Sequence, residues 1–550
     1  MGVAFSPVDD MGTVPVIDIM RAIAAMDPTA DCVIGPHGRR TSRGEFLDRV
    51  RRFAWSLFQH GHGCHRERST LADHESGQDH LAIIVTNRVE YLEAMVGALA
   101  ARVAPFNVNH RYTVDELIEV LRDANATAAI VESSFLPTLR QAQRTLPHLR
   151  TIFCIGPGDD TALDFETALA DAPDGDPPVT PSPDDLYLLY TGGTTGKPKG
   201  VMWRNADAVI ECFDAARAPQ PLHDYLTSMR PDLRSLTCAP FMHGAGQWTA
   251  MRALLGGGCV IIQNNTAHLD PADIWETVAR ESVSLLGIVG ESFARPLLDE
   301  LVAGSHDASS LNVVLTGGAP LSAPTKTRLL ELLPTVMVVD GFGSSESGGQ
   351  MSLVSTAGSA TSGIFRPRGT RTVVLSHDRT RVLSPGSDEI GWLATRGRLP
   401  LGYLGDPDLT ALAYPIVDGV RYAAPGDHAR IRSDGTIDAL GRESVCINTG
   451  GEKVYAEEVE DAVLCHRSVR DCIVVGRPSD TWGSEVAAVI SLAHPDMQAP
   501  GPSELALLMG DLARYKHPKA VIVVDEIRRS PAGKADYAWA RAIAAGTELK

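Results

Sequence analysis

A segment rich in glycine, threonine and lysine constrains the fold of this chain more than any other feature. It spans residues 190–201, reads YTGGTTGKPKGV and holds four glycines, three threonines and two lysines. The apolar run that leads into it, LYLLY at 186–190, is typical of a buried strand. Glycines at the end of a strand let the backbone approach a ligand closely, so that its N–H groups face an anion. The segment therefore predicts a phosphate-binding loop at the end of a strand.

Side chains of the same segment add donors and charge. The threonines supply hydroxyl groups, and Lys197 and Lys199 supply positive charge in a chain whose net charge is −18. The segment is not a Walker A loop, because Pro198 stands where that motif requires serine or threonine. A flexible glycine turn is the alternative interpretation, but the length and order of the pattern favour phosphate binding. The predicted contacts are Thr191, Gly192, Gly193, Thr194, Thr195, Gly196 and Lys199.

The size and charge of the chain limit the classes of function open to it. Its 550 residues exceed what one hydrophobic core usually serves, so two or more domains are expected. The acidic balance argues against a nucleic-acid-binding protein, which needs a basic face to displace counterions from phosphates. The nine cysteines are scattered without a CxxC pair, which suggests reduced thiols and a cytoplasmic setting. No secretory signal is apparent, and no apolar run reaches the roughly 18 residues of a membrane span.

Local signals along the chain predict helices and strands in alternation. Ser42 and Glu45 form a candidate capping box before one helix, and Thr113 and Glu116 repeat this device before another. The apolar stretch 128–131 follows as a strand. Strands that alternate with helices predict a largely parallel sheet.

The pattern of predicted elements changes near Gly441. The residues after it are predicted to form a separate α+β unit, so we place a boundary between a domain at 1–441 and a smaller domain at 442–550. The elements predicted for the smaller domain are helix 457–466, strands 472–476 and 485–492, helix 503–515 and strand 520–525.

Segment 60–80 contains five histidines, a density of imidazole groups that is compatible with a transition-metal site. Their spacing is irregular, and arginines and acids lie between them. Irregular spacing favours a polar surface loop over a metal site. We therefore leave this segment out of the predicted mechanism.

Two further predicted strands end in glycine turns. The run LNVVL at 311–315 leads into TGGAP, and the run VMVV at 336–339 leads into DGFGSSE. In open α/β sheets, ligands collect at the carboxyl ends of strands, so these turns and the phosphate segment are expected to line one crevice. Any one of them alone would be an ordinary turn, and the evidence lies in their joint order.

The order of these motifs resembles that of the adenylate-forming superfamily, which includes acyl-CoA synthetases, luciferases and the adenylation domains of peptide synthetases. The resemblance covers nearly the whole chain beyond about residue 40. It implies an α/β fold with a large N-terminal domain of mostly parallel sheets and helices, and a small mobile α+β C-terminal domain. It also implies a reaction in two steps. A carboxylate attacks the α-phosphorus of ATP and releases pyrophosphate, and a thiol then attacks the acyl-adenylate.

The resemblance also assigns the residues around the nucleotide. Ser345 is expected to meet the α-phosphate, and Glu346, together with Thr194, to ligate Mg²⁺, a role that suits a hard carboxylate. Without the family, Glu346 would be interpreted as a solvent-facing acid. The residues expected to hold the adenine are Gly317, Gly318, Ala319, Asp340, Gly341 and Phe342.

Three later residues are assigned in the same way. Asp427, in YAAPGD, matches an aspartate that accepts hydrogen bonds from both ribose hydroxyls, and Arg442, in GRES, matches an arginine that reaches the ribose or phosphate. Lys534, in RRSPAGKADY, matches the catalytic lysine whose ammonium bridges the substrate carboxylate and the α-phosphate as negative charge builds. On local sequence alone these residues are a turn aspartate, an unremarkable arginine and a solvated surface lysine.

The second step is expected to use the thiol of CoA. Family members rotate the small domain between the steps and present a glycine-rich segment that lets the pantetheine arm pass. The resemblance assigns Gly450, Gly451 and Lys453 to this CoA site.

The chain departs from the family pattern at several positions. Phe342 replaces the usual tyrosine, Ser345 the usual threonine and Ala456 the usual proline. Ser444 stands where a hinge aspartate or lysine is common, which puts the details of hinge rotation in doubt.

The acid is predicted to be apolar. His243, in APFMHGAGQWTA, matches a position that flanks the acyl pocket, although a core histidine is the alternative, and the small residues after it are expected to leave room for a bulky chain. Relatives that activate amino acids place an aspartate near this segment, and none is present here. An unpaired ammonium would be costly to desolvate, so a neutral chain is favoured. The predicted acyl-binding residues are His243, Gly244, Val289 and Gly290.

The resulting prediction is an ATP-, Mg²⁺- and CoA-dependent acyl-CoA synthetase. The segments GVMWRN, INTGGEKVYAEEVE and RSPAGKADYAWA most resemble actinobacterial enzymes for medium- or long-chain fatty acids, including the branch that acts on steroid side chains. An acyl-AMP ligase that delivers to a carrier protein is one alternative. A non-catalytic adenylate-binding protein is another, and the presence of both Lys534 and Glu346 argues against it. The expected partners are a carboxylic acid, ATP and CoA, and a homodimer and peripheral membrane attachment stay open.

Overall fold

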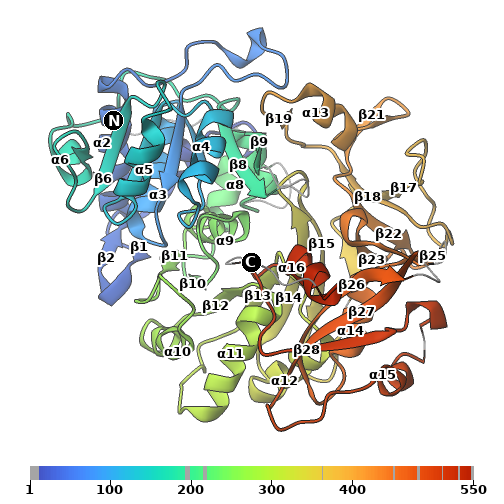
Figure 1. Ribbon diagram of the computed structural model, residues 1–550. Helices are drawn as coiled ribbons and strands as arrows, with labels where there is room; N and C mark the ends of the chain where they lie inside the picture. The colour runs from blue at the N-terminus through green and yellow to red at the C-terminus, as the bar shows by residue number, and fades with distance from the viewer. Residues whose placement is uncertain are drawn as a thin grey trace.

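The computed structural model describes residues 11–192, 198–214, 220–361, 363–449, 452–479, 483–510, 512–530 and 533–546. Within these ranges, two large sheets form the N-terminal body and two small sheets follow residue 442. Figure 1 shows the first sheet in blue and teal at the upper left, the second in green and yellow through the middle, and the C-terminal unit in red beside it.

The first sheet is parallel except at the edge that carries the phosphate segment. Its order is β19-β9-β8-β4-β3-β5-β6-β7, and β8 pairs with β9 antiparallel, as β9 does with β19. Helices cover both faces, with α2, α3 and α6 on one and α4 and α5 on the other, so the inner strands are buried throughout. The strands are β3 (His80–Ile84), β4 (Ala104–Asn107), β5 (Ala128–Glu132), β6 (Thr151–Ile155), β7 (Leu163–Asp164), β8 (Leu186–Gly192), β9 (Pro198–Arg204) and β19 (Gly402–Tyr403).

The second sheet joins a parallel part to an antiparallel part. The strands β1, β11, β10, β12, β13 and β14 are parallel neighbours, and every pairing from β14 onward is antiparallel. The parallel part confirms the predicted α/β class. The strands are β1 (Asp31–Ile34), β2 (Arg40–Ser42), β10 (Arg234–Thr237), β11 (Cys259–Ile261), β12 (Leu285–Ile288), β13 (Val313–Gly317), β14 (Met337–Ser344), β15 (Gly348–Ser355), β16 (Ile364–Pro367), β17 (Thr372–Leu375), β18 (Gly391–Arg396), β20 (Ile416–Val417), β21 (Val420–Ala423), β22 (Asp427–Ile431) and β23 (Ile437–Arg442).

Two helices of the N-terminal body, α2 and α4, begin at the caps that the sequence predicts. The Ser42 hydroxyl accepts a hydrogen bond from the Glu45 amide at the start of α2, and Thr113 and Glu116 form a complete capping box at the start of α4. The helices are α1 (Val16–Met26), α2 (Arg43–Gln59), α3 (Val89–Ala100), α4 (Val114–Asp123), α5 (Leu136–Gln143), α6 (Phe165–Ala170), α7 (Asn205–Glu211), α8 (Leu222–Thr227), α9 (Gly244–Leu255), α10 (Pro271–Arg280), α11 (Gly290–Ala303), α12 (Ala323–Leu332) and α13 (Pro407–Ala413).

The C-terminal unit has a hydrophobic core on each face of its three-stranded sheet. Helices α14 and α15 pack on one face and α16 on the other. The predicted helix 503–515 is wrong in length, because α15 ends at Leu508, just before Gly510, a residue that lowers helix propensity. The elements are β24 (Ile447–Thr449), β25 (Glu452–Val454), α14 (Ala456–Val463), β26 (Val469–Ser479), β27 (Gly483–Leu492), α15 (Pro502–Leu508), β28 (Ala520–Val524) and α16 (Tyr537–Ala544).

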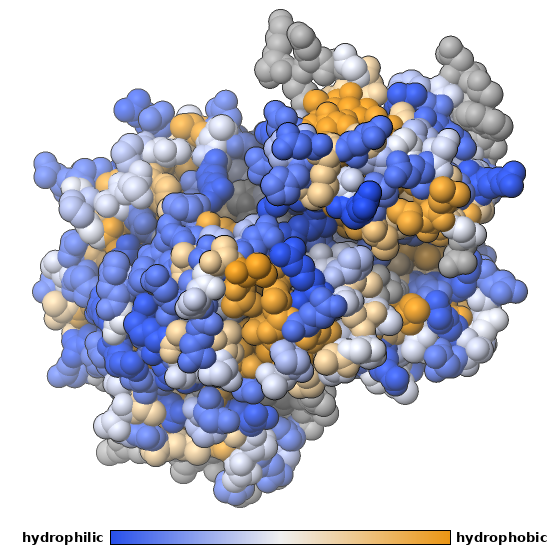
Figure 2. Space-filling view, turned by 90° about the horizontal axis from the view of Figure 1, so that it is seen from below, coloured by the Kyte–Doolittle hydropathy of each residue, from blue (hydrophilic) through white to orange (hydrophobic). Residues whose placement is uncertain are grey.

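The surface mixes charged residues with separate apolar patches. Figure 2 shows several such patches on the lower face of the molecule, each bordered by hydrophilic residues. Among the exposed apolar side chains, Leu507 of α15 and Ile416 of β20 are the most exposed, at 84% and 71%. In the part of the chain that the structure describes, no helix is both long and apolar enough to cross a membrane.

Candidate active site

The described ends of the predicted phosphate segment lie in the antiparallel hairpin strands β8 and β9. Thr191 pairs with Lys199 across the hairpin. Glycine is required at position 200, because a Cβ there would lie 2.8 Å from Cε2 of Tyr190. Four of the predicted contacts, Gly193, Thr194, Thr195 and Gly196, lie outside the described residues.

Asn107, at the end of β4, holds the base of this hairpin. Its Oδ1 accepts a hydrogen bond from the Tyr190 amide (2.8 Å), and its Nδ2 donates to the carbonyl oxygens of Tyr190 (2.9 Å) and Met242 (2.7 Å). One buried amide therefore joins the phosphate hairpin to the residue before His243. The sequence analysis missed Asn107, although a polar residue that ends an apolar strand is a recognisable signal.

The two other glycine segments lie side by side, but the turn predicted directly after residue 339 is wrong, because pairing with β15 continues β14 as a strand through Ser344. In the parallel pair of β13 and β14, Thr316 is in register with Asp340, and Gly317 with Gly341. A Cβ on Gly317 would lie 3.0 Å from the carbonyl oxygen of Gly341, so the two strands are in close backbone contact at these glycines. The amide of Gly290 donates to the Thr316 hydroxyl (3.0 Å) and brings the start of α11 to the same place.

The loop at 345–346 is fastened to the phosphate hairpin and to β19. The indole Nε1 of Trp203, in β9, donates to the carbonyl oxygen of Ser345 (2.8 Å), and the Tyr403 hydroxyl donates to Oε1 of Glu346 (2.9 Å). The ammonium of Lys199 lies 5.7 Å from the centroid of the Tyr403 ring. Sequence reasoning missed Trp203 and Tyr403, because nothing local to either residue indicates these long-range contacts.

Glu346 has the chemistry of a magnesium ligand. Its side chain is half-buried, and the Tyr403 hydroxyl occupies Oε1, while Oε2 has no hydrogen-bond partner among the described residues. Magnesium is commonly held by one or two carboxylates together with substrate phosphates. A single carboxylate beside the phosphate hairpin fits that requirement.

Asp427 and Arg442 are direct neighbours across β22 and β23. They are paired residues of this antiparallel ladder, and Nε of Arg442 donates to Oδ1 of Asp427 (3.1 Å). The carboxylate of Asp427 is the main reason why the pKa of Arg442 is raised, and Glu346 raises it further. The predicted ribose-binding pair is therefore assembled and lies within electrostatic reach of Glu346.

Lys534 lies on a turn of the C-terminal unit that touches the N-terminal body. The amide of Gly533 donates to the carbonyl oxygen of Ser530 (2.8 Å), and Gly533 has a φ of +72°. A Cβ at this glycine would lie 2.4 Å from Oγ of Ser292 and 3.1 Å from the carbonyl oxygen of Val289. Only a residue without a side chain lets the turn approach the end of β12 so closely.

The ammonium of Lys534 is surrounded by the charged residues predicted for the site. Its side chain keeps contact with solvent, but the surrounding protein removes enough water to lower the pKa of Lys534. Arg442 lowers this pKa further, whereas Glu346 and Asp427 raise it. The charged groups at positions 346, 427 and 442 therefore lie within electrostatic reach of Lys534.

His243, at the N-terminus of α9, lies within electrostatic reach of Lys534. Burial lowers the pKa of His243 to about 4, and the charges of Lys534, His110 and Arg111 lower it further. Its Nε2 is buried and has no hydrogen-bond partner among the described residues. At neutral pH the imidazole is uncharged, which suits a position beside an apolar acyl chain.

The small residues after His243 do not leave the room that the sequence predicts. A Cβ on Gly244 would lie 3.1 Å from Leu189, and one on Gly246 would lie 2.4 Å from the carbonyl oxygen of Pro240. These glycines allow α9 to pack closely against β8 and against its own preceding loop. The expectation of open space at 244–246 is therefore wrong, because neighbouring atoms already fill it.

Lys453, predicted to bind CoA, faces Glu443, the residue before the predicted hinge position at 444. Its ammonium donates to Oε1 of Glu443 (2.9 Å), and Glu443 also pairs with Nε2 of His428. Gly450 and Gly451, which complete the predicted CoA site, lie outside the described residues. In this arrangement Lys453 forms part of the junction between the two domains.

Two of the histidines of segment 60–80, His62 and His65, lie beside the carboxylate of Asp79. Nε2 of His65 lies 2.6 Å from Oδ2 of Asp79, and Nδ1 of His62 lies 3.6 Å from the same oxygen. These contacts fasten the loop that leads into β3. No group of three or more His, Cys, Asp or Glu in the described ranges is arranged to hold a metal ion.

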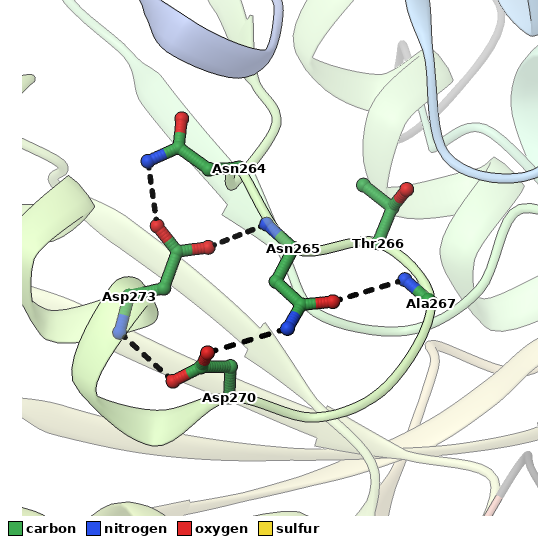
Figure 3. Close-up of a pocket in the computed structure, with 6 residues that line it drawn as sticks. All are labelled: Asn264, Asn265, Thr266, Ala267, Asp270 and Asp273. Atoms are coloured by element: carbon green, nitrogen blue, oxygen red, sulfur yellow. Dashed lines mark hydrogen bonds between the residues drawn. The ribbon is translucent and has the colours of Figure 1, made fainter.

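A separate polar depression of about 550 Å³ lies in the loop between β11 and α10. Figure 3 shows that Asp273 accepts hydrogen bonds from the side chain of Asn264 and the amide of Asn265, while Thr266 points away from this network. None of the predicted site residues lines it. The residues that line it are Asn264, Asn265, Thr266, Ala267, Asp270 and Asp273.

Comparison with known families gives two matches along the chain. A family described as AMP-binding enzyme matches residues 20–404, and one described as AMP-binding enzyme C-terminal domain matches residues 458–534. The first match alone covers more than half of the chain. The two matches lie on either side of the turn at Asp427 and the junction at Arg442.

Curated relatives match over nearly the full length. A medium-chain acyl-CoA ligase of Mycobacterium avium is 45% identical over 542 residues, which are 96% of this chain and 98% of that protein. A medium/long-chain-fatty-acid/3-oxocholest-4-en-26-oate CoA ligase of Mycolicibacterium smegmatis is 37% identical over 530 residues, 92% of each chain.

Solved structures share the fold. An anthranilate CoA ligase in complex with anthranoyl-AMP superposes with a TM-score of 0.82 at 20% identity, over 97% of this chain and 98% of that one. A fatty acyl CoA synthetase of Mycobacterium tuberculosis superposes with a TM-score of 0.70 at 23% identity, over 97% and 98% of the two chains.

Proposed function

The chain belongs to the AMP-binding enzyme family, and from this premise we propose that it is an ATP-dependent acyl-CoA synthetase. The proposed substrate is a medium- or long-chain fatty acid or a steroid side-chain acid. One observation carries the proposal. Lys534 of the C-terminal unit lies within electrostatic reach of Glu346, Asp427 and Arg442, and the glycine before it lies against Val289 and Ser292 of the N-terminal body.

In the first proposed step, the substrate carboxylate attacks the α-phosphorus of ATP, and pyrophosphate leaves. Negative charge builds on the oxygens of the α-phosphoryl group, and the ammonium of Lys534 stabilises it there. Asp427 accepts hydrogen bonds from the ribose hydroxyls, while Arg442 holds Asp427 in place. Ser345, whose carbonyl oxygen is fixed by Trp203, presents its hydroxyl to the α-phosphate.

We propose Glu346, with Thr194 of the hairpin turn, as the Mg²⁺ site. When bound, the ion neutralises charge on the phosphates of ATP. The Tyr403 hydroxyl orients the Glu346 carboxylate by donating to Oε1, so that Oε2 is left for the metal. Lys199, which stacks over Tyr403, adds positive charge on the same side.

In the second proposed step, the thiol of CoA attacks the carbonyl carbon of the acyl-adenylate, and AMP leaves. We propose that the C-terminal unit rotates between the steps about a boundary at 441/442. The pairing of the sheets supports this boundary, because in the described residues β23 is the last strand of the large sheet and β24 to β28 pair only with one another. The rotation would bring Gly450, Gly451 and Lys453 to the site.

The apolar nature of the acid is supported by the surroundings of His243. Its neutral imidazole, the side chain of Val289 and the backbone of Gly290 offer no charge to pair with an ammonium or a second carboxylate. The two curated relatives compared above carry names that specify fatty-acid or steroid-acid substrates. We propose the same class of acid for this chain, in a cytoplasmic setting supported by nine free cysteines.

An assay of the products of both proposed steps tests the function. Purified protein, ATP, Mg²⁺, palmitate and CoA should yield AMP, pyrophosphate and palmitoyl-CoA. Acyl-adenylate that accumulates without thioester would favour an acyl-AMP ligase. The same assay is run with a panel of fatty acids of graded length and a steroid side-chain acid. If the protein binds nucleotide but releases no pyrophosphate with any of them, a non-catalytic adenylate-binding protein is favoured.

A further inference from the structure

A lysine that the proposed mechanism does not use is buried directly behind the adenine turns. Lys326, on α12, is 1% exposed. Its ammonium donates to the carbonyl oxygen of Thr361 (2.7 Å) and forms an ion pair with Oδ2 of Asp340. Taking an ammonium out of water is costly unless it is paired, so this contact with Asp340 needs an explanation.

Asp340 lies in β14, directly before Gly341 and Phe342, two other residues predicted to hold the adenine. It is 7% exposed and lies in register with Thr316, the residue before the other turn. Burial raises the pKa of Asp340, and the charge and hydrogen bond of Lys326 lower it. Lys326 is the charged group that acts on this carboxyl in the described residues. Without it, burial would be unopposed and would favour the protonated acid.

The protonation state of Asp340 matters for base recognition. Adenine presents an exocyclic amino group, a donor, where hypoxanthine presents a carbonyl oxygen, an acceptor. An ionised carboxylate only accepts hydrogen bonds, whereas a protonated carboxyl also donates one. An ionised Asp340 therefore matches adenine and repels hypoxanthine.

We propose that Lys326 is a positioning residue that holds Asp340 as an ionised acceptor and thereby sets the preference for ATP over ITP. The inference rests on the proposed function and on the assignment of Asp340 to adenine. It adds a residue on α12 to the nucleotide site, although Lys326 itself does not touch the base.

The test compares Lys326→Met with the wild type, using ATP and ITP in turn and pyrophosphate release as the readout. The variant should raise KM for ATP at least tenfold with kcat little changed, and it should lower the ratio of kcat/KM for ATP over ITP by about tenfold or more. Titration calorimetry with AMP and IMP should show the same loss of discrimination without turnover. Raising the pH should partly restore the preference of the variant, because Asp340 then ionises without its partner.

Two further variants separate this role from a structural one. Lys326→Arg keeps the positive charge and should retain the ATP preference. Arg49→Met removes the partner of the equally buried Glu93, far from the adenine turns, and should lower stability without altering the ratio. Thermal unfolding of each variant shows whether it is folded.

The outcomes are distinct. A folded Lys326→Met with a wild-type ATP/ITP ratio overturns the inference, as does a wild type that shows no preference. If Lys326→Met does not fold, Asp340→Asn decides, because an amide offers both a donor and an acceptor and should bind AMP and IMP nearly equally. An unchanged ratio in Asp340→Asn also overturns the inference. Failure of the wild type to release pyrophosphate with any acid instead refutes the proposed function.

Discussion

The two halves of the site are held in place by different forces. In the N-terminal body, the turns after β13 and β14 follow strands with hydrogen-bonded neighbours on both sides, from β12 to β15. The C-terminal unit meets the body through the backbone at Gly533, beside Lys534, and elsewhere through charged side chains such as the exposed pair of Arg470, in β26, and Asp299 (3.1 Å). The first half is fixed by sheet register, the second by contacts that are easily exchanged.

This difference explains how one molecule can combine a fixed nucleotide site with a movable catalytic group. Ladder hydrogen bonds are buried and break only if the sheet opens, whereas exposed ion pairs contribute little, about 0 to 1 kcal/mol each. A unit held by such pairs can leave the body at small cost. The four variants below, from the largest expected effect to the smallest, challenge this comparison.

Lys534→Ala should cause the largest loss. Removing the ammonium should lower the rate of pyrophosphate release by at least about 100-fold, because the charge that builds on the α-phosphate is no longer compensated. Thioester formation from added acyl-adenylate and CoA should be much less affected. Lys519→Ala, at an exposed lysine of the same unit, serves as the control. Unchanged adenylation in Lys534→Ala would remove the C-terminal half from the site.

Glu460→Gln tests the stability of the C-terminal unit. Burial raises the pKa of Glu460 to about 8, so between about pH 4.5 and 8 the folded state holds a proton that the unfolded state has lost. Its contribution to stability is therefore lost as the pH rises through that range. The glutamine cannot ionise and can still accept from the Val474 amide (2.8 Å), so the variant should be more stable at pH 9 by about 2 to 4 kcal/mol.

The difference for Glu460→Gln should shrink toward pH 5, where the wild-type carboxyl is protonated in the fold at little cost. Thermal unfolding at both pH values measures it. The exposed Glu452 provides the control, since Glu452→Gln should show no such pH dependence. A constant difference at all pH values would contradict the assignment of the effect to ionisation.

Trp203→Phe probes the N-terminal half. It removes the indole donor to Ser345 and leaves that carbonyl without its partner, at a cost of about 1 to 3 kcal/mol in the free energy of unfolding. KM for ATP should rise as the loop at 345–346 loosens. Trp55→Phe loses an equivalent hydrogen bond to Gly175 (3.0 Å) away from the site, and should cost stability alone. Equal kinetics in both variants would show that the loop does not depend on Trp203.

Glu443→Gln should have the smallest effect. It weakens the contact of Glu443 with His428, which crosses the proposed boundary at 441/442, and its contact with Lys453 inside the C-terminal unit. We expect the rate of the CoA-dependent step to change by about twofold in single-turnover experiments and the rate of adenylation to stay unaltered, because exposed ion pairs contribute little. Glu389→Gln, at the exposed pair with Arg381, is the matched control. A large loss of adenylation would mean that the junction is rigid.

Much of this molecule could be predicted from local patterns. The capping residues place the starts of α2 and α4, and the apolar runs place β8, β13 and β14. These signals work because hydrogen-bonding geometry and hydrophobic period act over a few residues. The glycine turn predicted at 340–343 is wrong, because pairing with β15 continues β14 to Ser344. The length of α15 was predicted wrongly, because its apolar pattern continues past the residue at which the helix ends.

The sequence by itself determined which residues are chemically suited to phosphate, metal and carboxylate, and in what order the strands present them. Only the tertiary structure decided which of them meet: Trp203 with Ser345, Tyr403 with Glu346 and Lys326 with Asp340. It also decided that the space beside Gly244 is filled. The physical reason is that such contacts join residues up to 142 positions apart in the sequence, and their energies depend on burial and packing that no local pattern encodes.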